Sequence, residues 1–252
     1  MATIASRPAE SGSARIPAGV PPLKAGQGRS FLWRRLHSLS GIFPVGAFLV
    51  EHFISNAFAT NGPHAYADEV KFLTGIPFLV WVEILFIYIP IAYHAFYGIY
   101  IWWRGDSNNA EYPFIGNWMY TSQRWTGIIA LVFIAYHSAT MRWLGVHIPG
   151  NAAGAFGKVQ MELFGHPWLV AWYVIGIVTA SWHFAYGIWL FAAKWGFTTG
   201  AQARKRFGVV CAGVGVLFVV VGLASLQAFF KYPQQPVHPP ASHEAEQAQI
   251  LK

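Results

Sequence analysis

Five long apolar segments constrain the fold of this chain more than any other feature. They cover residues 36–58, 78–103, 122–144, 168–193 and 208–230, and each holds 23 to 26 residues. About 20 residues of helix cross the ~30 Å hydrocarbon layer of a bilayer. Helix is the expected form because lipid offers no hydrogen-bond partner to an open backbone. The sequence therefore predicts an all-α membrane protein with five transmembrane helices.

The composition supports a membrane location and excludes several cofactors. Hydrophobic residues make up 55% of the chain and charged residues 11%, whereas soluble domains carry about a quarter charged residues. The single cysteine, Cys211, excludes internal disulfides, a cysteine-ligated iron–sulfur cluster in this chain and covalent haem attachment through C-x-x-C-H. Nucleic acid is not an expected partner, since no basic run is interleaved with aromatic residues.

The two ends of the chain differ in composition from its apolar middle. Residues 1–30 are rich in Ala, Ser, Gly and Pro and lack the apolar core of a signal peptide, which predicts a flexible tail. Residues 31–230 form the expected five-helix domain, in which the first four helices make a bundle. Residues 231–252 are rich in Pro, Gln, Ala and His and are expected to form a disordered tail.

The distribution of basic residues predicts the orientation in the membrane. Twelve of the 17 Lys and Arg residues lie on the side of the N-terminal tail and of the second and fourth connections, and five lie on the other side. Cytoplasmic loops carry the excess of Lys and Arg in membrane proteins. The N-terminus is therefore expected in the cytoplasm and the C-terminus outside.

One histidine falls within each of the first four apolar segments, and none falls within the fifth. They are His52, His94, His137 and His183. Each lies about 23 Å along its helix, because it follows the start of its segment by 15 or 16 residues at ~1.5 Å per residue. Successive helices run in opposite directions. The sequence therefore predicts an outer pair, His52 with His137, and an inner pair nearer the cytoplasm, His94 with His183.

Two facing imidazoles at one depth indicate a haem site. They can bind both axial positions of a haem iron, and the core of a helical bundle can hold such a cofactor. Zinc and copper sites usually need three or four ligands together. Gly98 and Gly187 follow the inner histidines by four residues, which is expected to leave room beside each ligand. The alternatives are histidines that only hydrogen-bond a neighbouring helix, and small residues that only let helices approach closely.

The sequence around the histidines repeats. Residues 93–100 align with residues 182–189, and Ser-Gly-Ile at residues 40–42 is echoed by Thr-Gly-Ile at residues 126–128. This pattern suggests two helical hairpins related by a pseudo-twofold axis along the membrane normal, with the fifth helix as an addition.

Several motifs, in their order and spacing, resemble those of one known family. They are Arg34-Arg35-Leu36-His37-Ser38, Glu51-His52, Tyr93-His94-Ala95-Phe96-Tyr97-Gly98, Gln123-Arg124-Trp125-Thr126-Gly127-Ile128 and Ala193-Lys194-Trp195-Gly196. Over about residues 31–230 the chain resembles the di-haem cytochrome b membrane-anchor subunit of bacterial succinate dehydrogenases, the succinate:menaquinone oxidoreductases, of the five-helix single-chain type.

The resemblance implies two haem b groups, with the iron of the outer haem on His52 and His137 and the iron of the inner haem on His94 and His183. It implies a flavoprotein subunit and an iron–sulfur subunit as partners, and a location in the bacterial cytoplasmic membrane. Electrons are expected to pass from the iron–sulfur subunit through the two haems to quinone, by resemblance menaquinone. No succinate chemistry is expected in this chain, which has no G-x-G-x-x-G and no cysteine cluster.

Charged haem propionates need partners, and candidates gather near the cytoplasmic helix ends. They are Arg35, His37, Ser38, Arg124 and Lys194, which are suited to charge-assisted hydrogen bonds. The alternative for the basic residues is snorkelling of their side chains to the membrane surface. His37 and Lys194 are also candidates to line a cytoplasmic quinone pocket.

Two carboxylates, Glu51 and Glu83, lie in the outer half of the apolar segments. Quinone reduction takes up protons as well as electrons, so a nearby carboxylate with a pKa raised by burial is a candidate relay. The alternative is a neutral carboxyl group that is hydrogen-bonded within the bundle.

Other functions stay open at this point. The chain also suits the di-haem anchor of a fumarate reductase or of another respiratory dehydrogenase, such as a formate or hydrogen oxidiser. A different class is a transporter or proton channel that uses membrane histidines as a relay and holds no haem.

Overall fold

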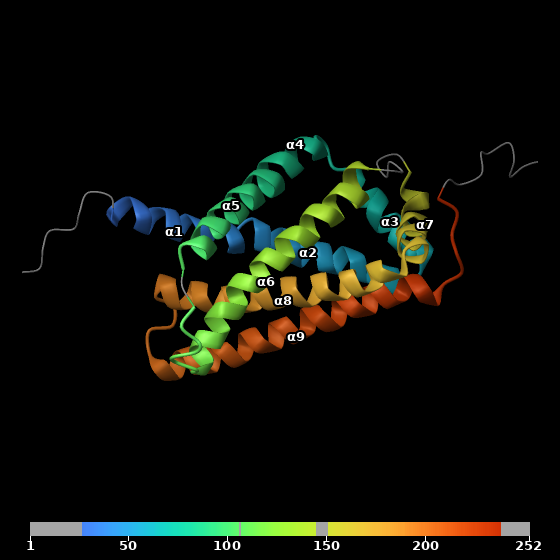
Figure 1. Cartoon of the computed structure of the whole chain (residues 1–252). Coiled ribbons are helices and arrows are strands. Elements are labelled where there is room, and N and C mark those ends of the chain that lie inside the picture. The colour runs from blue at the N-terminus through green and yellow to red at the C-terminus, as the bar shows by residue number, and fades with distance from the viewer. Residues whose placement is uncertain (1–26, 106, 145–150, 238–252) are drawn as a thin grey trace, which may run out of the picture. The chain divides into compact units, whose positions relative to one another are not determined.

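The structure, a computed structural model, describes residues 27–105, 107–144 and 151–237 (Figure 1). All regular elements in this part of the chain are helical, as predicted. They are α1 (Gln27–Ile42), α2 (Val45–Ala57), η1 (Phe58–Asn61), α3 (Pro63–Thr74), α4 (Leu79–Glu83), η2 (Ile84–Tyr88), α5 (Ile89–Trp103), α6 (Ile115–Ser138), η3 (Ala139–Trp143), η4 (Ala152–Gly154), α7 (Ala155–Gly165), α8 (Pro167–Trp195) and α9 (Ala201–Lys231). The chain divides after Arg35 into two units, and the first unit contributes only the beginning of α1 to the described residues.

Four described helical stretches are long and apolar enough to cross a membrane. They are Ser30–Asn61, Leu79–Trp103, Pro167–Trp195 and Ala201–Lys231. They overlap four of the five predicted spans, and they establish a multi-pass, all-α membrane protein. The predicted span at residues 122–144 falls in α6 and η3, so the count of five membrane-crossing helices stays a prediction.

Proline and glycine set several helix ends. Pro63 and Pro167 stand in the first turns of α3 and α8, where a missing N–H costs no helical hydrogen bond. α8 ends at Trp195 and is followed by Gly196, whose φ of 82° lies in the left-handed region. The N–H of Phe197 then returns to the carbonyl of Ala192 at 2.9 Å. This glycine-terminated arrangement satisfies a carbonyl that the last turn of α8 would otherwise leave open.

Proline also interrupts two of the apolar stretches. Pro44 separates α1 from α2, and Pro90 follows η2, a π-helical turn. A proline inside a helix lacks the N–H and presses on the carbonyl four residues earlier, and a wider turn relieves both problems. The N–H of Ile89 accordingly bonds the carbonyl of Ile84, five residues back. A second π-helical turn, η3, ends α6.

α8 is central to the packing of the second unit. It packs along α9 and along α6, while α2 packs against α9 and α5 packs against α6 (Figure 1). These contacts bring the four helices that carry the predicted histidine pairs into one bundle.

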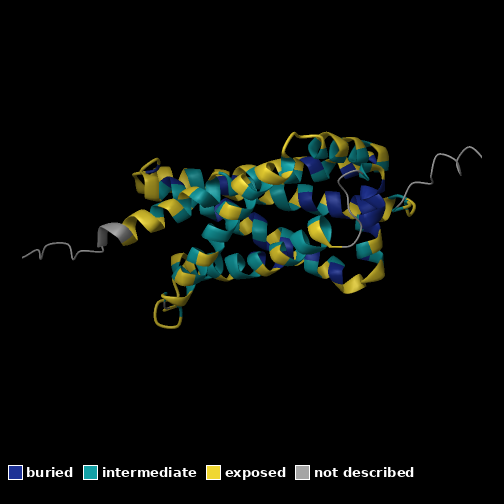
Figure 2. Cartoon of the chain, turned by 90° about the horizontal axis from the view of Figure 1, so that it is seen from above, coloured by how far each residue is buried: buried dark blue, intermediate teal, exposed yellow. Residues whose placement is uncertain are grey.

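The most buried residues gather where α3, α7, the start of α8 and the end of α9 meet. Phe156 and Leu169 have no exposed surface, and Figure 2 shows the dark blue of buried residues concentrated there. The ring of Tyr66 meets the rings of Phe156 and Phe229 edge-on, with centroids 5.8 and 5.5 Å apart. Burial raises the pKa of the Tyr66 hydroxyl to about 12. α3 and α7 lie in connections for which the sequence predicted no helix.

The described part of the C-terminal tail packs on α7. The amide of Gln160, which is 1% exposed, donates to three main-chain carbonyls of residues 229–233 at 2.9, 3.1 and 3.2 Å. Its oxygen accepts the N–H of Gln235 at 2.8 Å. Residues 232–237 are therefore held by a buried amide, whereas the sequence analysis expected disorder from residue 231. Residues 238–252 of that tail, and residues 1–26 of the other, lie outside the described residues.

Candidate functional site

The structure brings the four histidines of the apolar segments together in two pairs. In the inner pair, His94 on α5 and His183 on α8 have ring centroids 6.1 Å apart and ring planes at 88°. In the outer pair, His52 on α2 and His137 on α6 have centroids 5.6 Å apart and planes at 75°. The pairing in space is the one that the depth of each histidine predicts.

Main-chain carbonyls orient both rings of the inner pair. Nδ1 of His94 lies 3.0 Å from the carbonyl oxygen of His37, and Nδ1 of His183 lies 3.0 Å from that of Gln123. A carbonyl only accepts, so Nδ1 carries the proton in each ring. Nε2 is then the nitrogen with a free lone pair, which is the state that a metal ligand requires.

Side chains orient the outer pair. The Tyr173 hydroxyl lies 3.3 Å from Nδ1 of His137, and Phe133 stacks against the His137 ring at 5.6 Å with 19° between the planes. Asn56 lies one turn after His52 on α2, where its Nδ2 lies 3.4 Å from Nε2 of the His52 ring and donates to the His52 carbonyl at 2.8 Å. The two pairs are therefore held by different means, although both join helices that are not consecutive in the chain.

The donor set fits two bis-imidazole haem irons. With metal–nitrogen bonds of about 2 Å, imidazoles on opposite sides of one metal have ring centroids roughly 6 Å apart, close to the two observed spacings. Within the described ranges, no group of three or more His, Cys, Asp or Glu side chains is placed to hold a metal ion, so each level offers two protein ligands. Nδ1 of His37 is buried beside the inner pair and has no hydrogen-bond partner among the described residues. A bound cofactor would supply a partner for such a group.

Three of the predicted propionate partners lie close to the inner pair or to one another. His37 stacks on His94 with ring centroids 4.1 Å apart and 14° between the planes. Lys194 stands at the end of α8, directly before Trp195. Trp195 donates from Nε1 to the Ser38 hydroxyl at 3.1 Å, which leaves the Ser38 O–H available to an acceptor.

The other two predicted partners have different surroundings. The guanidinium of Arg124 donates to the main-chain carbonyls of Trp102 and Gly105, the latter at 2.7 Å. It would have to leave these carbonyls to bind a propionate. Arg35 belongs to the first unit, where its guanidinium lies 4.8 Å from the centroid of the Phe31 ring.

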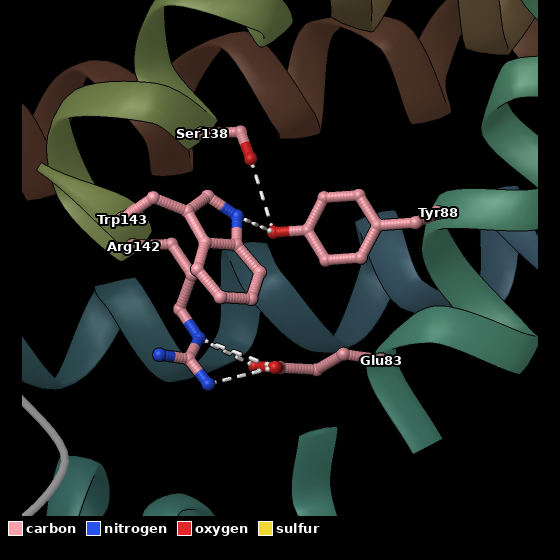
Figure 3. Close-up of polar contacts among 5 residues, drawn as sticks. All are labelled: Glu83, Tyr88, Ser138, Arg142 and Trp143. Carbon is pink, nitrogen blue, oxygen red and sulfur yellow. Dashed lines mark hydrogen bonds and ion pairs between the residues drawn. The ribbon is translucent and has the colours of Figure 1, made fainter. Parts of the chain in front are cut away.

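Glu83 forms a bidentate ion pair with Arg142 (Figure 3). Nε of Arg142 lies 2.9 Å from Oε1, and Nη2 lies 2.8 Å from Oε2. Beside them, the Tyr88 hydroxyl accepts the N–H of Trp143 at 2.8 Å and lies 3.1 Å from the Ser138 hydroxyl. The contact of Tyr88 with Trp143 joins the two π-helical turns η2 and η3, and the ion pair joins the end of α4 to η3. Glu83 thus has an arginine from a distant part of the chain as its partner.

Glu51 and Lys158 make polar contacts of their own. Glu51 is exposed on α2 and accepts a hydrogen bond from Ser55. Lys158 on α7 is 5% exposed and donates to the carbonyls of Met141 and Leu144 at 3.0 and 3.3 Å. Burial lowers the pKa of the Lys158 ammonium, whose charge caps the carbonyl end of η3.

The space beside the two predicted glycines is taken by residues from neighbouring helices. A Cβ added at Gly98 would lie 3.3 Å from Cε1 of His37, and one added at Gly187 would lie 3.6 Å from Nε2 of Gln123. The glycines that contact the inner imidazoles themselves are Gly41 and Gly127, which the sequence analysis did not single out.

Sequence reasoning also missed Gln123, Tyr173 and Arg142 as partners of site residues. Their roles depend on which side chain of another helix lies opposite, and no spacing within one helix reveals that. The repeated Gly-Ile at residues 41–42 and 127–128 was the only available signal for the two glycines.

The helices and their internal histidine pairs define an all-α, multi-pass membrane protein of the cytochrome b type. The chain is 34% identical over 205 residues to the succinate dehydrogenase cytochrome b558 subunit of Bacillus subtilis (strain 168), in a match that covers 80% of this chain and 98% of the relative. It therefore belongs to the family of succinate dehydrogenase cytochrome b subunits, as its motifs indicated. No protein-family model matches the chain.

Proposed function

We propose that this chain is the membrane anchor of a succinate dehydrogenase and conducts electrons through two haem b groups to quinone. Family membership supports the assignment to this enzyme. The observation that carries the two-haem assignment is the pair of imidazole contacts at 5.6 and 6.1 Å, built from four different helices. A histidine proton relay would need a continuous chain of hydrogen-bonded groups, whereas these four imidazoles form two pairs.

In this proposal His94 and His183 hold the inner haem, and His52 and His137 hold the outer haem. Haem b supplies an iron centre that gains and loses one electron. The carbonyls of His37 and Gln123 keep Nδ1 of each inner ligand protonated, and so present Nε2 to the iron. His37, Ser38 and Lys194 are the proposed partners of the inner-haem propionates, and Arg35 and Arg124 complete the predicted set. The alternative role of His37 and Lys194, lining a cytoplasmic quinone pocket, stays part of the proposal.

The proposed partners are a flavoprotein subunit and an iron–sulfur subunit on the cytoplasmic side of a bacterial inner membrane. The succinate chemistry belongs to them, because this chain has one cysteine and no nucleotide-binding glycine motif. The side with 12 of the 17 basic residues is the proposed docking side, which places the N-terminus in the cytoplasm and the C-terminus outside.

With haem b bound at the His94–His183 pair and at the His52–His137 pair, the chain would offer two one-electron carriers between the cytoplasmic partner and menaquinone. A full crossing of the membrane by one charge is worth ~2.3 kcal/mol per 100 mV. The membrane potential can therefore help or oppose quinone reduction. The same path run in reverse suits a fumarate reductase, so the direction depends on the redox potentials.

Glu83 and Glu51 are the proposed proton-relaying carboxylates for quinone. In the structure the Glu83 carboxyl group accepts hydrogen bonds from the guanidinium of Arg142. Quinone binding would have to loosen that pair before Glu83 could pass a proton on.

The test is to purify the assembled complex and to measure its haem content and its spectrum. Two haem b per chain and haem reduction by succinate are expected, and His94→Ala is expected to remove only one haem. A chain with no Soret band and no b-type α-band would support the transporter or proton-channel alternative. Haem reduction by formate or hydrogen, without a flavoprotein that oxidises succinate, would assign the chain to another dehydrogenase.

A further inference from the structure

The two inner imidazoles rest on matching pieces of backbone from different helices. His94 donates from Nδ1 to the carbonyl of residue 37, and His183 donates from Nδ1 to the carbonyl of residue 123, both at 3.0 Å. Four residues after each carbonyl stands a glycine, Gly41 in one case and Gly127 in the other. Residues four apart share one face of a helix, so carbonyl and glycine lie on the side that meets the ring.

Each glycine leaves, beside its Cα, the space that the imidazole ring occupies. A Cβ added at Gly41 would overlap Cε1 of His94 and lie 2.9 Å from its Nδ1. A Cβ added at Gly127 would lie 2.8 Å from Cε1 and 3.2 Å from Nδ1 of His183. Atoms of a real side chain do not pack this closely, so any residue other than glycine would displace or turn the ring.

We propose that residues 37–41 and 123–127 form two equivalent seats that fix the planes of the inner imidazoles, with Gly41 and Gly127 as positioning residues. The carbonyl fixes the direction of Nδ1, and the bare glycine Cα fixes how far the ring approaches the helix. Together they remove rotation about the last side-chain bond of the ligand, and the inner planes consequently cross at 88°. This inference rests on the proposed function, since it assigns the rings to the iron of one haem.

The two seats differ at their first residue and at their fourth, where the Ser40 hydroxyl lies 3.4 Å from Nδ1 of His94 and the Thr126 hydroxyl donates to the main chain of its own helix. His37 lays its own ring on His94, whereas the Gln123 side chain donates from Nε2 to the carbonyl of His183 at 3.0 Å. The carbonyl and the glycine are common to both seats. They are therefore the parts to which positioning of the ring is assigned.

Gly41→Ala and Gly127→Ala in the assembled complex test the proposal by electron paramagnetic resonance. In a low-spin ferric haem with two imidazole ligands, the position of the low-field line depends on the angle between the ring planes. Each variant is expected to move the line of the inner haem and to leave that of the outer haem unchanged. Gly213→Ala is the matched control, because a Cβ added there meets nothing within 4 Å. An unmoved inner line in both variants would overturn the proposal.

A second experiment decides the case in which the alanine variants do not assemble. In a His94→Gly background the seat is empty, and free imidazole added to the complex is expected to restore the spectrum of the inner haem. In this background Gly41→Ala cannot strain a ring that is attached to the chain, because residue 94 carries no side chain. It is expected to weaken the imidazole rescue by roughly tenfold or more, because overpacking of this kind costs that much.

Equal rescue with and without Gly41→Ala would overturn the seat, and so would no rescue in His94→Gly alone. Gly213→Ala in the same background is again expected to change nothing. A complex that contains no haem at all would contradict the proposed function itself. Haem that is present but indifferent to both glycines contradicts only the seats.

Discussion

The imidazole of His37 lies flat on the imidazole of His94, with ring centroids 4.1 Å apart and 14° between the planes. The carbonyl of the same residue accepts the Nδ1 proton of His94 at 3.0 Å. His37 thus contacts the His94 imidazole on its face, through the stacked ring, and at its edge, through the carbonyl. The matching residue in the other half of the bundle, Gln123, also offers a carbonyl but no aromatic ring.

Substitutions of His37 distinguish the effect of its stacked ring from the effect of its ring nitrogens. His37→Phe keeps a flat ring on His94, and His37→Ala removes it, while both keep the carbonyl. If stacking is what matters, the midpoint potential of the inner haem is expected to shift more in His37→Ala than in His37→Phe, with the outer haem unchanged. Equal shifts in both variants would instead assign the effect to the His37 nitrogens, as propionate or quinone contacts require. Spectroelectrochemical titration of the assembled complex measures both potentials.

Loss of an outer ligand is expected to remove one haem and to leave the other. His52→Ala and His137→Ala each break the outer pair, whose rings lie 5.6 Å apart. The inner haem is expected to remain reducible by succinate, while quinone reduction falls because the path to the outer side is cut. Haem content and the rate of haem reduction check this. Loss of the inner haem alone in either variant would contradict the pairing.

The fold was predictable where it depends on burial in lipid. Leu79–Trp103 and Pro167–Trp195 begin and end within two residues of the predicted spans, because apolar length alone decides them. α3 and α7 were missed because their helical turns are stabilised by contacts such as Tyr66 with Phe156, which join distant segments. The π-helical turn before Pro90 depends on how the chain accommodates one proline, which a periodicity does not specify.

The site was predictable to the level of which histidines meet, and no further. Depth follows from a fixed rise per residue, so His94 and His183 are level by arithmetic. The partner of Glu83 does not follow, because Arg142 lies 59 residues later and belongs to another helix. The role of Gly41 likewise depends on the ring of His94 that lies over it.

The ion pair of Glu83 and Arg142 is expected to act as a unit in stability (Figure 3). Their side chains are 14% and 18% exposed, so removing one partner leaves a largely buried charge. Glu83→Gln and Arg142→Gln are each expected to cost about 1–3 kcal/mol, the range for leaving one partner of a buried hydrogen bond unsatisfied. The double variant is expected to cost less than the sum. Thermal unfolding of the purified complex measures all three, with Asp68→Asn, an exposed carboxylate on α3, as the control.

A role of Glu83 in proton transfer predicts more than a loss of stability. Glu83→Gln is expected to lower quinone reduction roughly a hundredfold or more, since a general acid–base group typically contributes about 10²–10⁴-fold. Succinate oxidation with a soluble dye acceptor is expected to be unchanged, because it does not use this end of the chain. Glu51→Gln is the parallel test for the second carboxylate. Wild-type quinone turnover in Glu83→Gln would remove Glu83 from the proposed relay.

The amide of Gln160 is expected to hold residues 232–237 against α7. Its side chain makes four hydrogen bonds to the backbone of residues 229–235 while only 1% exposed. Gln160→Leu fills the same volume but leaves those groups without a partner, and each buried group left unpaired costs about 1–3 kcal/mol. The expected result is a lower Tm of the complex and faster proteolysis within residues 232–237.

Gln234→Ala distinguishes that buried amide from an exposed one in the same segment. It is expected to leave both the Tm and the proteolysis rate unchanged. If Gln160→Leu also leaves proteolysis unchanged, the segment must be held by its other contacts. One of these is the donation from the Asn151 amide to the Val237 carbonyl at 2.8 Å. Asn151→Ala would then release the end of the segment. If the Gln160 amide holds the segment, Gln160→Leu is instead expected to free residues 232–237 along their whole length.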